Sequence, residues 1–249
     1  MVLLKSRDEI EILRRANLMV AEALIEVREM VRPGLTTGEI DEALESYVRK
    51  KKVKAAFKGY NGYPASVCTS VNDEVVHGLP SRARTLKEGD IIGIDFGVCL
   101  EGYFGDAAIT VAVGKASAEA ELLMQATEEA LNLAIEKARV GNRLSDISHA
   151  VQSRVEKNGF TPVRDFVGHG IGKRLHEEPQ VPNYGLPNRG IRLKAGMVLA
   201  IEPMINAGGS GVTVKPDGWT AVTQDGSLSA HYEHSVAITE DGPYVLSRI

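Results

Sequence analysis

Two aspartates flank a short turn in the middle of the chain. Asp95 ends an apolar run, and Asp106 follows eleven positions later, with Glu101-Gly102 between them. A hairpin turning near Glu101-Gly102 sets the two carboxylates opposite each other or nearly so, and directly opposed Cβ atoms lie about 5 Å apart. Like charges so placed on an apolar strand repel, so either one is protonated or a cation lies between them. The alternative is that one aspartate faces solvent as a turn residue.

Three histidines lie beside glycine or proline and outside any helical pattern. His169 stands in the segment 168–172 (GHGIG), His176 begins the segment 176–179 (HEEP), and His77 ends an apolar run. The HExxH pattern of helical zinc proteases is excluded, because its second histidine would fall at Gln180. Each histidine has a structural alternative, since a lone histidine serves packing more often than metal binding.

Two glutamates stand next to strand patterns. Glu202 ends an apolar run, and Glu233 comes directly before the strand pattern 235–238 (SVAI). Alternation along that strand places His231 on the face of Glu233 and His234 on the other face. If Glu233 faces a site, His231 is therefore its neighbour and His234 is not; the alternative is an exposed glutamate at a strand end.

Together these positions offer four carboxylates and one imidazole: Asp95, Asp106, His169, Glu202 and Glu233. An oxygen-rich set without thiolates favours Mn²⁺, Fe²⁺ or Co²⁺, with Zn²⁺ as a further candidate, over a structural zinc site. Four carboxylates exceed what one ion needs. Two divalent ions about 3.5 to 4 Å apart, bridged by carboxylates and a water, would balance the charge and lower the pKa of that water toward neutrality. The set predicts metal-assisted hydrolysis.

An internal repeat explains how distant carboxylates could meet. Residues at one fixed separation of 107 positions match between two segments: Arg32, Gly34, Glu39, Ile40, Ala43 and Leu44 match Arg139, Gly141, Asp146, Ile147, Ala150 and Val151. The same offset carries residues 86–95 onto 193–202, and so Asp95 onto Glu202. Two copies are too few for a solenoid and predict two similar α/β halves about a pseudo-two-fold axis. The alternative is a chance likeness of two apolar strands.

Capping boxes mark the starts of the first two helices. Ser6 with Glu9 opens a helix that residues 32–34 (RPG) end, and Thr36 with Glu39 opens a second helix that runs toward the basic cluster 49–54. A comparable pair returns at 117–138 and, after a break at 139–141, around 146–151. The rest is rich in strand and turn patterns without a Pro/Ser linker, which predicts one α/β domain over residues 1–249.

Composition narrows the class of protein. The 249 residues carry a formal net charge of −4, with 43% hydrophobic and 25% charged residues, typical of a soluble globular protein. A chain without basic excess is not expected to take nucleic acid as its main partner. Cys68 and Cys99 form no CxxC or Cys/His cluster, which predicts a cytoplasmic protein without disulfides or a thiolate zinc site. No apolar stretch reaches the roughly 18 residues of a membrane span, so no membrane association is expected.

Over nearly its whole length the chain resembles the type I methionine aminopeptidases. The motifs that carry the resemblance are residues 59–68 (GYNGYPASVC), 76–78 (VHG), 94–97 (IDFG), 105–106 (GD), 168–172 (GHGIG), 176–179 (HEEP), 201–204 (IEPM) and 232–234 (YEH). Their order and combination are highly specific. The resemblance implies the α/β pita-bread fold, in which two related halves with antiparallel strands surround a dinuclear metal site. It implies Asp95 on one metal, Asp106 and Glu233 bridging both, and His169 and Glu202 on the other.

The resemblance also implies a reaction. Such enzymes remove the N-terminal methionine from nascent proteins whose second residue is small, and a hydroxide that bridges the two metals attacks the first peptide bond. His176 would hydrogen-bond the scissile carbonyl oxygen and the developing oxyanion, while His77 would contact the peptide nitrogen. Glu202 would shuttle the proton of the hydroxide. The free α-amino group of the peptide would bind a metal or the carboxylates around it.

A pocket for the methionine side chain follows from the same resemblance. Its expected lining is Phe57, Tyr60, Tyr63, Cys68, Leu175, Met204 and Trp219. Three aromatics lie within residues 57–63, although such a cluster forms a core more often than a pocket. Two positions depart from the usual bacterial pattern. Leu175 stands where Phe is common, which bears on the tightness of the pocket, and His231 stands where Gln is common, which bears on hydrogen bonding around the metals.

Two other classes of protein have the same fold. Xaa-Pro aminopeptidases and prolidases have the same fold and similar metal ligands, but typically carry an additional N-terminal domain for which 249 residues leave no room. A non-catalytic binding protein on this fold typically loses ligands, whereas this chain retains all five and both histidines. The basic run 49–54 is either a transient ribosome contact or, as we favour, a solvated helix C-terminus. We expect a monomer that acts on N-terminal Met peptides with two ions of Co²⁺, Mn²⁺, Fe²⁺ or Zn²⁺.

Overall fold

Four long helices begin where the sequence predicts them. The computed structural model describes residues 2–249 and contains α1 (Arg7–Met30), α2 (Thr37–Lys51), α3 (Ala118–Lys137) and α4 (Leu144–Glu156). Ser6 and Thr36 both form the predicted capping boxes: each side-chain oxygen accepts the backbone N–H three residues on, and that residue's carboxylate accepts the cap's own N–H. Within the described range, no helix has the length and apolar character that a bilayer crossing requires.

A nine-stranded sheet runs through the middle of the molecule. Its central path is β1-β4-β5-β14-β9-β7-β8, and β2 and β15 pair with β4 and β14. The strands are β1 (Lys54–Ala55), β2 (Val67–Val71), β4 (Ile91–Leu100), β5 (Tyr103–Ala112), β7 (Gly168–Gly170), β8 (Glu177–Val181), β9 (Val198–Ile201), β14 (Glu233–Thr239) and β15 (Gly242–Val245). All of its strand pairs are antiparallel. The predicted fold class, antiparallel strands combined with helices, is confirmed.

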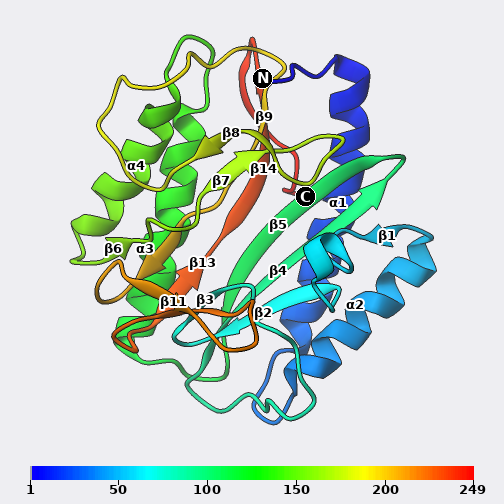
Figure 1. The fold of residues 1–249 in the computed structure, drawn as a ribbon, viewed down its shortest axis with the longest axis vertical. Helices are drawn as coiled ribbons and strands as arrows, with labels where there is room; N and C mark the ends of the chain where they lie inside the picture. Colours follow the sequence, from blue (N-terminus) through cyan, green and yellow to red (C-terminus); the bar gives the residue numbers. More distant parts are fainter. Residues whose placement is uncertain (1) are drawn as a thin grey trace.

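Two small sheets and a short helix border the large sheet. One sheet has the order β13-β10-β6 and the other β11-β12-β3. Their bounds are β3 (Glu74–Val76), β6 (Thr161–Pro162), β10 (Met204–Asn206), β11 (Val212–Val214), β12 (Ala221–Thr223) and β13 (Ser229–His231), and the 3-10 helix η1 spans Tyr60–Gly62. In Figure 1 these elements lie toward the lower half of the molecule, below β7 and β8.

The helices cover one face of the large sheet in two pairs. In Figure 1, α1 and α2 lie on the right, α3 and α4 on the left, and the strands cross between them. Leu24 of α1 and Leu44 of α2 pack with Phe96 of β4 in one buried cluster. Leu123 of α3 and Ile147 of α4 belong to a second cluster with residues of β9 and β14. The opposite face of the sheet is left free to hold polar side chains.

The 107-residue repeat recurs in the backbone contacts. The isolated bridge Thr36↔Thr85 has its counterpart in Arg143↔Arg192. The Gly34 N–H donates to the Leu86 carbonyl as the Gly141 N–H donates to the Leu193 carbonyl. The starts of α2 and α4, and of β4 and β9, show the same separation. Two halves of like construction are therefore present, as the sequence predicts.

The β4–β5 hairpin sets the spacing of the two aspartates. Leu100 pairs with Tyr103, so the turn consists of Glu101 and Gly102 alone. Both have positive φ, 53° and 81°, as a tight hairpin turn requires. Asp95 then pairs with Ala108 and Asp106 with Gly97. The carboxylates are diagonal neighbours on one face rather than directly opposed, because the turn is centred one residue later than a directly opposed pair needs.

Candidate active site

Five neighbouring strands supply the predicted ligand set. Asp95 comes from β4, Asp106 from β5, Glu233 from β14 and His169 from β7, while Glu202 directly follows β9. These strands stand in the order β4-β5-β14-β9-β7 in the sheet, so their side chains project from one continuous face. All five residues line a cavity of about 690 Å³. The pseudo-two-fold partners Asp95 and Glu202 thus reach the same cavity from the two halves, as predicted.

The polar atoms of this set suit a cation. Nitrogen or oxygen atoms of Asp106, His169 and Glu233 all lie within 4.8 Å of one another, and the three side chains are buried. Nε2 of His169 lies 3.5 Å from Oε1 of Glu202. Among the described residues, Asp95 Oδ1, Asp106 Oδ1 and Glu233 Oε1 find no hydrogen-bond partner. Buried carboxylate oxygens left without a partner are costly unless a cation satisfies them, so the residues fit divalent metal ions.

Without a cation, burial disfavours the deprotonated, charged form of these carboxyl groups. Burial raises the pKa of Asp95 to about 7 and the pKa of Glu202 to about 8. Burial, reinforced by the neighbouring carboxylates, holds the pKa of Asp106 and of Glu233 well above the usual range. A divalent cation reverses this balance because it stabilises the deprotonated carboxylates.

His169 directs a nitrogen lone pair toward the carboxylate cluster. Its Nδ1 lies 2.9 Å from the carbonyl oxygen of Gly170. A carbonyl oxygen only accepts, so Nδ1 carries the proton and Nε2 is free to bind a metal. Burial, with His176 nearby, lowers the pKa of His169 to about 3, which keeps the imidazole neutral as a metal ligand must be.

The two other predicted histidines border the cavity outside this cluster. Tyr60 Oη lies 2.8 Å from Nδ1 of His176, and the His176 ring meets the His169 ring edge to face with centroids 4.3 Å apart. His77 packs edge to face on Phe166 and has a φ of 60°, rare for a residue with a side chain. Burial lowers the pKa of both histidines, to about 4 for His77, so both are neutral hydrogen-bonding groups.

The backbone after His77 is tightly enclosed. The Gly78 N–H donates to Ser70 Oγ over 3.2 Å, and the Gly78 carbonyl accepts from the Thr69 N–H and the Tyr63 hydroxyl. A Cβ at position 78 would collide with the backbone oxygen of Thr69. Glycine is therefore required where the chain turns to present His77.

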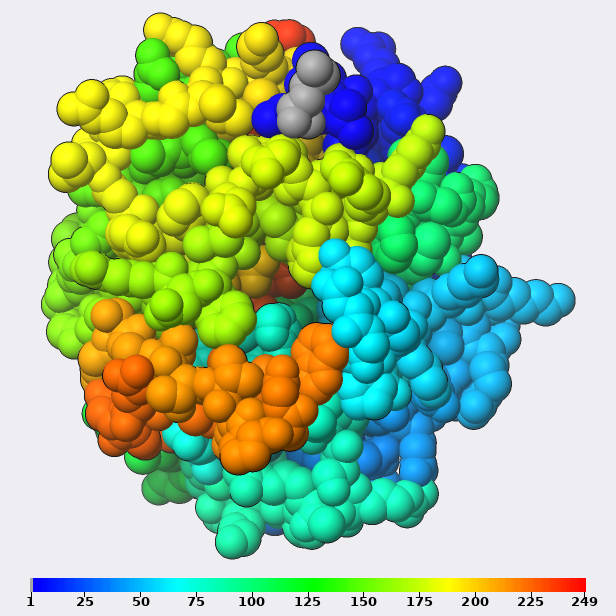
Figure 2. Space-filling view, in the orientation of Figure 1, coloured from blue at the N-terminus to red at the C-terminus, as the bar shows by residue number. Residues whose placement is uncertain are grey.

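All seven predicted pocket residues line the cavity: Phe57, Tyr60, Tyr63, Cys68, Leu175, Met204 and Trp219. Tyr63 and Trp219 meet edge to face with centroids 5.1 Å apart, and Leu175 is 2% exposed. Burial, followed by the neighbouring Asp95, raises the pKa of the Cys68 thiol, so Cys68 behaves as a small apolar group. Figure 2 shows the hollow near the centre of the molecule, bordered by cyan, yellow-green and orange atoms from three distant parts of the chain.

The remaining histidines are His149, His231 and His234. His231 is buried on the site's side, with Nε2 3.4 Å from Oε2 of Glu202, whereas His234 turns away and bonds Ser247 through Nδ1. His149 lies on α4, where its ring contacts Gly185 and Ser153 outside the cavity. His231 lies on the side of Glu233 and His234 does not, as predicted, although His231 ends β13 and Glu233 begins β14.

Sequence reasoning missed several residues of the cavity wall, among them Phe166 and Glu177. Phe166 lies in residues 161–167 (TPVRDFV), which match no motif, and only its stacking on His77 reveals it. Glu177 stands inside the motif that drew attention to His176, but its partner is distant in sequence.

Comparison with known proteins agrees with this geometry. The sequence profile of metallopeptidase family M24 matches residues 11–240. The chain is 53% identical over 249 residues to the methionine aminopeptidase of Clostridium perfringens, covering 100% of both chains. The crystal structure of the Thermotoga maritima methionine aminopeptidase superposes with a TM-score of 0.98 at 48% identity, again covering 100% of both. An Xaa-Pro dipeptidase from Bacillus anthracis shares the fold alone, with a TM-score of 0.79 at 22% identity, covering 99% of this chain and 62% of that one.

Proposed function

The chain belongs to metallopeptidase family M24, among its methionine aminopeptidases, and we propose that it removes the N-terminal methionine from new proteins whose second residue is small. The observation that carries this proposal is the buried cluster of Asp106, His169 and Glu233 beside two neutral histidines in one cavity. Relatives named methionine aminopeptidase are about half identical over the whole chain, whereas the Xaa-Pro enzyme is similar only in fold. This difference favours methionine as the residue removed.

We propose that two divalent ions occupy the cluster. Asp95 would bind one ion, His169 and Glu202 the other, and Asp106 and Glu233 would bridge the two. The unsatisfied oxygens of Asp95, Asp106 and Glu233 support this assignment. When bound, such ions polarise the peptide carbonyl and lower the pKa of water toward neutrality. Co²⁺, Mn²⁺, Fe²⁺ and Zn²⁺ all suit a set of carboxylates and imidazole, and the choice among them is left to measurement.

The chain's own residues then orient the peptide and move protons. In the proposed tautomer, the Tyr60 hydroxyl donates to Nδ1 of His176, which leaves the proton on Nε2, where His176 would donate it to the scissile carbonyl oxygen as charge develops. His77 would contact the peptide nitrogen. Glu202 would accept the proton of the attacking water and return it to the departing amine.

The pocket determines which residue is removed. The apolar walls around Leu175 and Met204 would enclose the methionine side chain, and the thiol of Cys68 stays neutral there. The peptide's free α-amino group would bind a metal or the surrounding carboxylates. If the amino group and the first side chain are both held in the cavity in this way, only the first peptide bond would reach the reacting atoms.

We further propose that residues 1–249 form one catalytic domain, since one sheet takes strands from both halves. A cytoplasmic location agrees with the two free thiols, Cys68 and Cys99, and we propose that the protein is a monomer. The basic run 49–54 is better explained as a solvated helix end than as a ribosome contact, because Arg49 and Lys51 pair with Glu45 and Glu22 on the protein itself.

The decisive experiment compares Met-Ala-Ser, Met-Lys-Ser and Ala-Pro-Ser as substrates. Metal-free protein is assayed alone and after addition of Mn²⁺, Co²⁺, Fe²⁺ or Zn²⁺. We expect metal-dependent release of methionine from Met-Ala-Ser and little from Met-Lys-Ser. Preferential cleavage of Ala-Pro-Ser would support the Xaa-Pro reading instead, and no metal-dependent cleavage at all would support a binding protein.

A further inference from the structure

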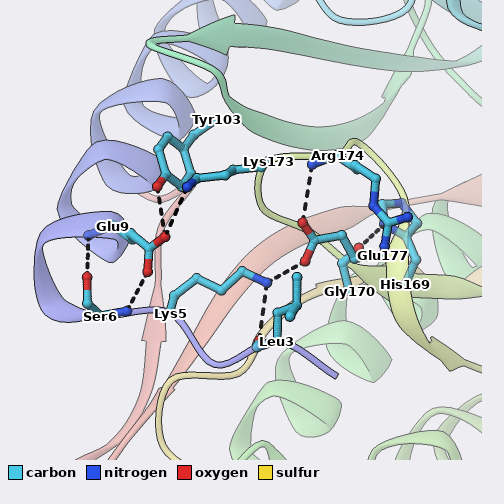
Figure 3. Close-up of polar contacts among 10 residues, drawn as sticks. All are labelled: Leu3, Lys5, Ser6, Glu9, Tyr103, His169, Gly170, Lys173, Arg174 and Glu177. Atoms are coloured by element: carbon cyan, nitrogen blue, oxygen red, sulfur yellow. Dashed lines mark hydrogen bonds and ion pairs between the residues drawn. The ribbon is translucent and has the colours of Figure 1, made fainter. Parts of the chain in front are cut away.

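A buried ion pair joins the N-terminal segment to the loop that carries His176. The ammonium of Lys5 contacts the carboxylate of Glu177, and their side chains are 6% and 3% exposed. The two residues are 172 positions apart in the chain. Figure 3 shows the Lys5 side chain extending from the start of α1 across to Glu177. A pair of opposite charges so well enclosed is a strong restraint, because separating them would leave one buried charge without a partner.

The Lys5 end of this pair is fixed in place. The Lys5 N–H donates to the Gly196 carbonyl over 2.7 Å, and Nζ also donates to the Leu3 carbonyl over 3.2 Å. Gly172 provides the space for the pair, since a Cβ there would lie 2.5 Å from Cε of Lys5 and 2.7 Å from Oε1 of Glu177. The segment before α1 therefore acts as an anchor whose position does not depend on the loop.

The Glu177 end closes that loop. Oε1 of Glu177 accepts the Arg174 N–H over 3.2 Å, and the Gly172 N–H donates to the Arg174 carbonyl over 3.2 Å. The Gly172 carbonyl in turn accepts the Phe104 N–H over 2.9 Å. Leu175 and His176 lie between these fastened points and reach the cavity. Neither is held by the pairing of a regular strand, so the loop depends on these few backbone hydrogen bonds and on side-chain contacts for its shape.

We propose that Lys5 is a positioning residue for the peptidase reaction: through Glu177 it holds the loop 172–177 in the shape that brings His176 to the scissile carbonyl. The proposal rests on the proposed function and deepens it. Lys5 is not among the residues that line the cavity, so its effect on the reaction passes through Glu177. A misplacement of about 1 Å at a reacting group can cost about a hundredfold in rate.

A second contact on the same loop is a weaker restraint. Nζ of Lys173 lies 3.8 Å from Oε1 of Glu9 and 5.3 Å from the Tyr103 ring, but its side chain is 68% exposed. Exposed ion pairs contribute little because solvent screens them. Of the two ion pairs that reach this loop, the buried Lys5–Glu177 pair is therefore the stronger restraint.

The test uses Lys5→Met and Glu177→Gln in the full chain with its metal restored. We expect kcat for Met-Ala-Ser to fall about tenfold or more, with KM changed by less than about threefold, because orientation is lost rather than pocket contacts. Bound metal per chain stays at the wild-type value. The matched control is Arg15→Met, which breaks the exposed pair with Glu101, and we expect it to change kcat by less than about twofold.

A double-mutant cycle separates positioning from general damage. In a His176→Ala background, Lys5→Met should lower kcat by less than about twofold further, because the group through which it acts is gone. Wild-type kcat in Lys5→Met, or an equal loss with and without His176, would overturn the proposal. If Lys5→Met fails to fold, the charge-free pair Lys5→Met with Glu177→Gln removes the buried charge and must show the same loss of kcat. Failure of the proposed function is distinct, because wild-type protein would then not cleave Met-Ala-Ser.

Discussion

His231 and Glu202 face each other at the edge of the candidate metal site, with Nε2 of His231 3.4 Å from Oε2 of Glu202. His231 cannot drift, because the Thr110 hydroxyl accepts its N–H over 2.9 Å and donates to its carbonyl over 2.7 Å. Within the described residues Nε2 of His231 has no hydrogen-bond partner. These two hydrogen bonds fix the backbone of His231, so its imidazole lies beside the Glu202 carboxylate.

Replacing His231 tests whether its imidazole supports Glu202. We expect His231→Leu to lower the affinity for Mn²⁺ or Co²⁺ about tenfold to a hundredfold, as loss of a group behind a metal ligand does. His231→Gln keeps a polar group there and should stay within about threefold of wild type. Titration calorimetry of metal-free protein measures both. Unchanged affinity in His231→Leu would show that Glu202 needs no such support.

Asp106→Asn tests the proposed bridge. The amide keeps the shape of the side chain but removes the charge that two cations would share, so we expect loss of bound metal and a fall in kcat of about a thousandfold or more. Metal per chain and turnover of Met-Ala-Ser are the measurements. The exposed Asp241→Asn serves as the control and should bind metal normally. Full activity in Asp106→Asn would exclude the bridging role.

Removing the metal should destabilise the fold. Without cations the cluster must either hold protons or bring like charges together, since burial and mutual repulsion raise the pKa values of its carboxylates. Mn²⁺ at a hundred times its Kd should add about 2.7 kcal/mol to the free energy of unfolding. Differential scanning calorimetry with and without chelator measures this as an increase in Tm. If Mn²⁺ raises the Tm of Asp106→Asn by the same amount, the stabilising ion binds somewhere other than this cluster.

Leu175→Ala should loosen the side-chain pocket. Leu175 is 2% exposed in the cavity wall, and truncation leaves a space that methionine no longer fills. We expect the preference for Met-Ala-Ser over Phe-Ala-Ser, measured as a ratio of kcat/KM, to fall about tenfold, the scale of one or two lost methylene contacts. A destabilisation of about 2–5 kcal/mol accompanies the cavity, so Tm is recorded in parallel. Leu186→Ala, at a position 70% exposed, should alter neither ratio nor Tm.

Gly78→Ala should displace His77. The added methyl meets the backbone of Thr69, which cannot move without disturbing β2. We expect kcat to fall about tenfold or more, because the imidazole loses its orientation toward the peptide. Gly93→Ala is the matched control, since the nearest atom to its Cβ, the Ser70 oxygen, lies 3.6 Å away. Comparable losses in the two variants would mean that general repacking, and not His77, is responsible.

Much of the fold could be predicted because its determinants are local. The capping boxes of Ser6 and Thr36 act within four residues, and the match of Asp95 with Glu202 needs only a constant offset. The hairpin was predicted to within a residue, and the exact pairing of Asp106 depended on the turn being two residues long.

The parts that could not be predicted depend on distant side chains. The ion pair of Glu177 could not be predicted from the sequence. Its partner Lys5 lies 172 positions away, and no periodic pattern connects the two residues. Phe166 likewise acquires meaning only where the fold brings it against His77. Such contacts depend on how helices, strands and loops pack against one another. This packing cannot be inferred from composition or from the spacing of residues.

The constant separation of 107 residues has a consequence for ancestry. One half supplies Asp95 and Asp106, and the other supplies His169, Glu202 and Glu233, so neither half alone could complete the site. A free half would have had to associate with a second copy of itself, as subunits do about the axis of a symmetric dimer. In the present chain, two covalently joined halves take the places that two subunits take in a symmetric dimer.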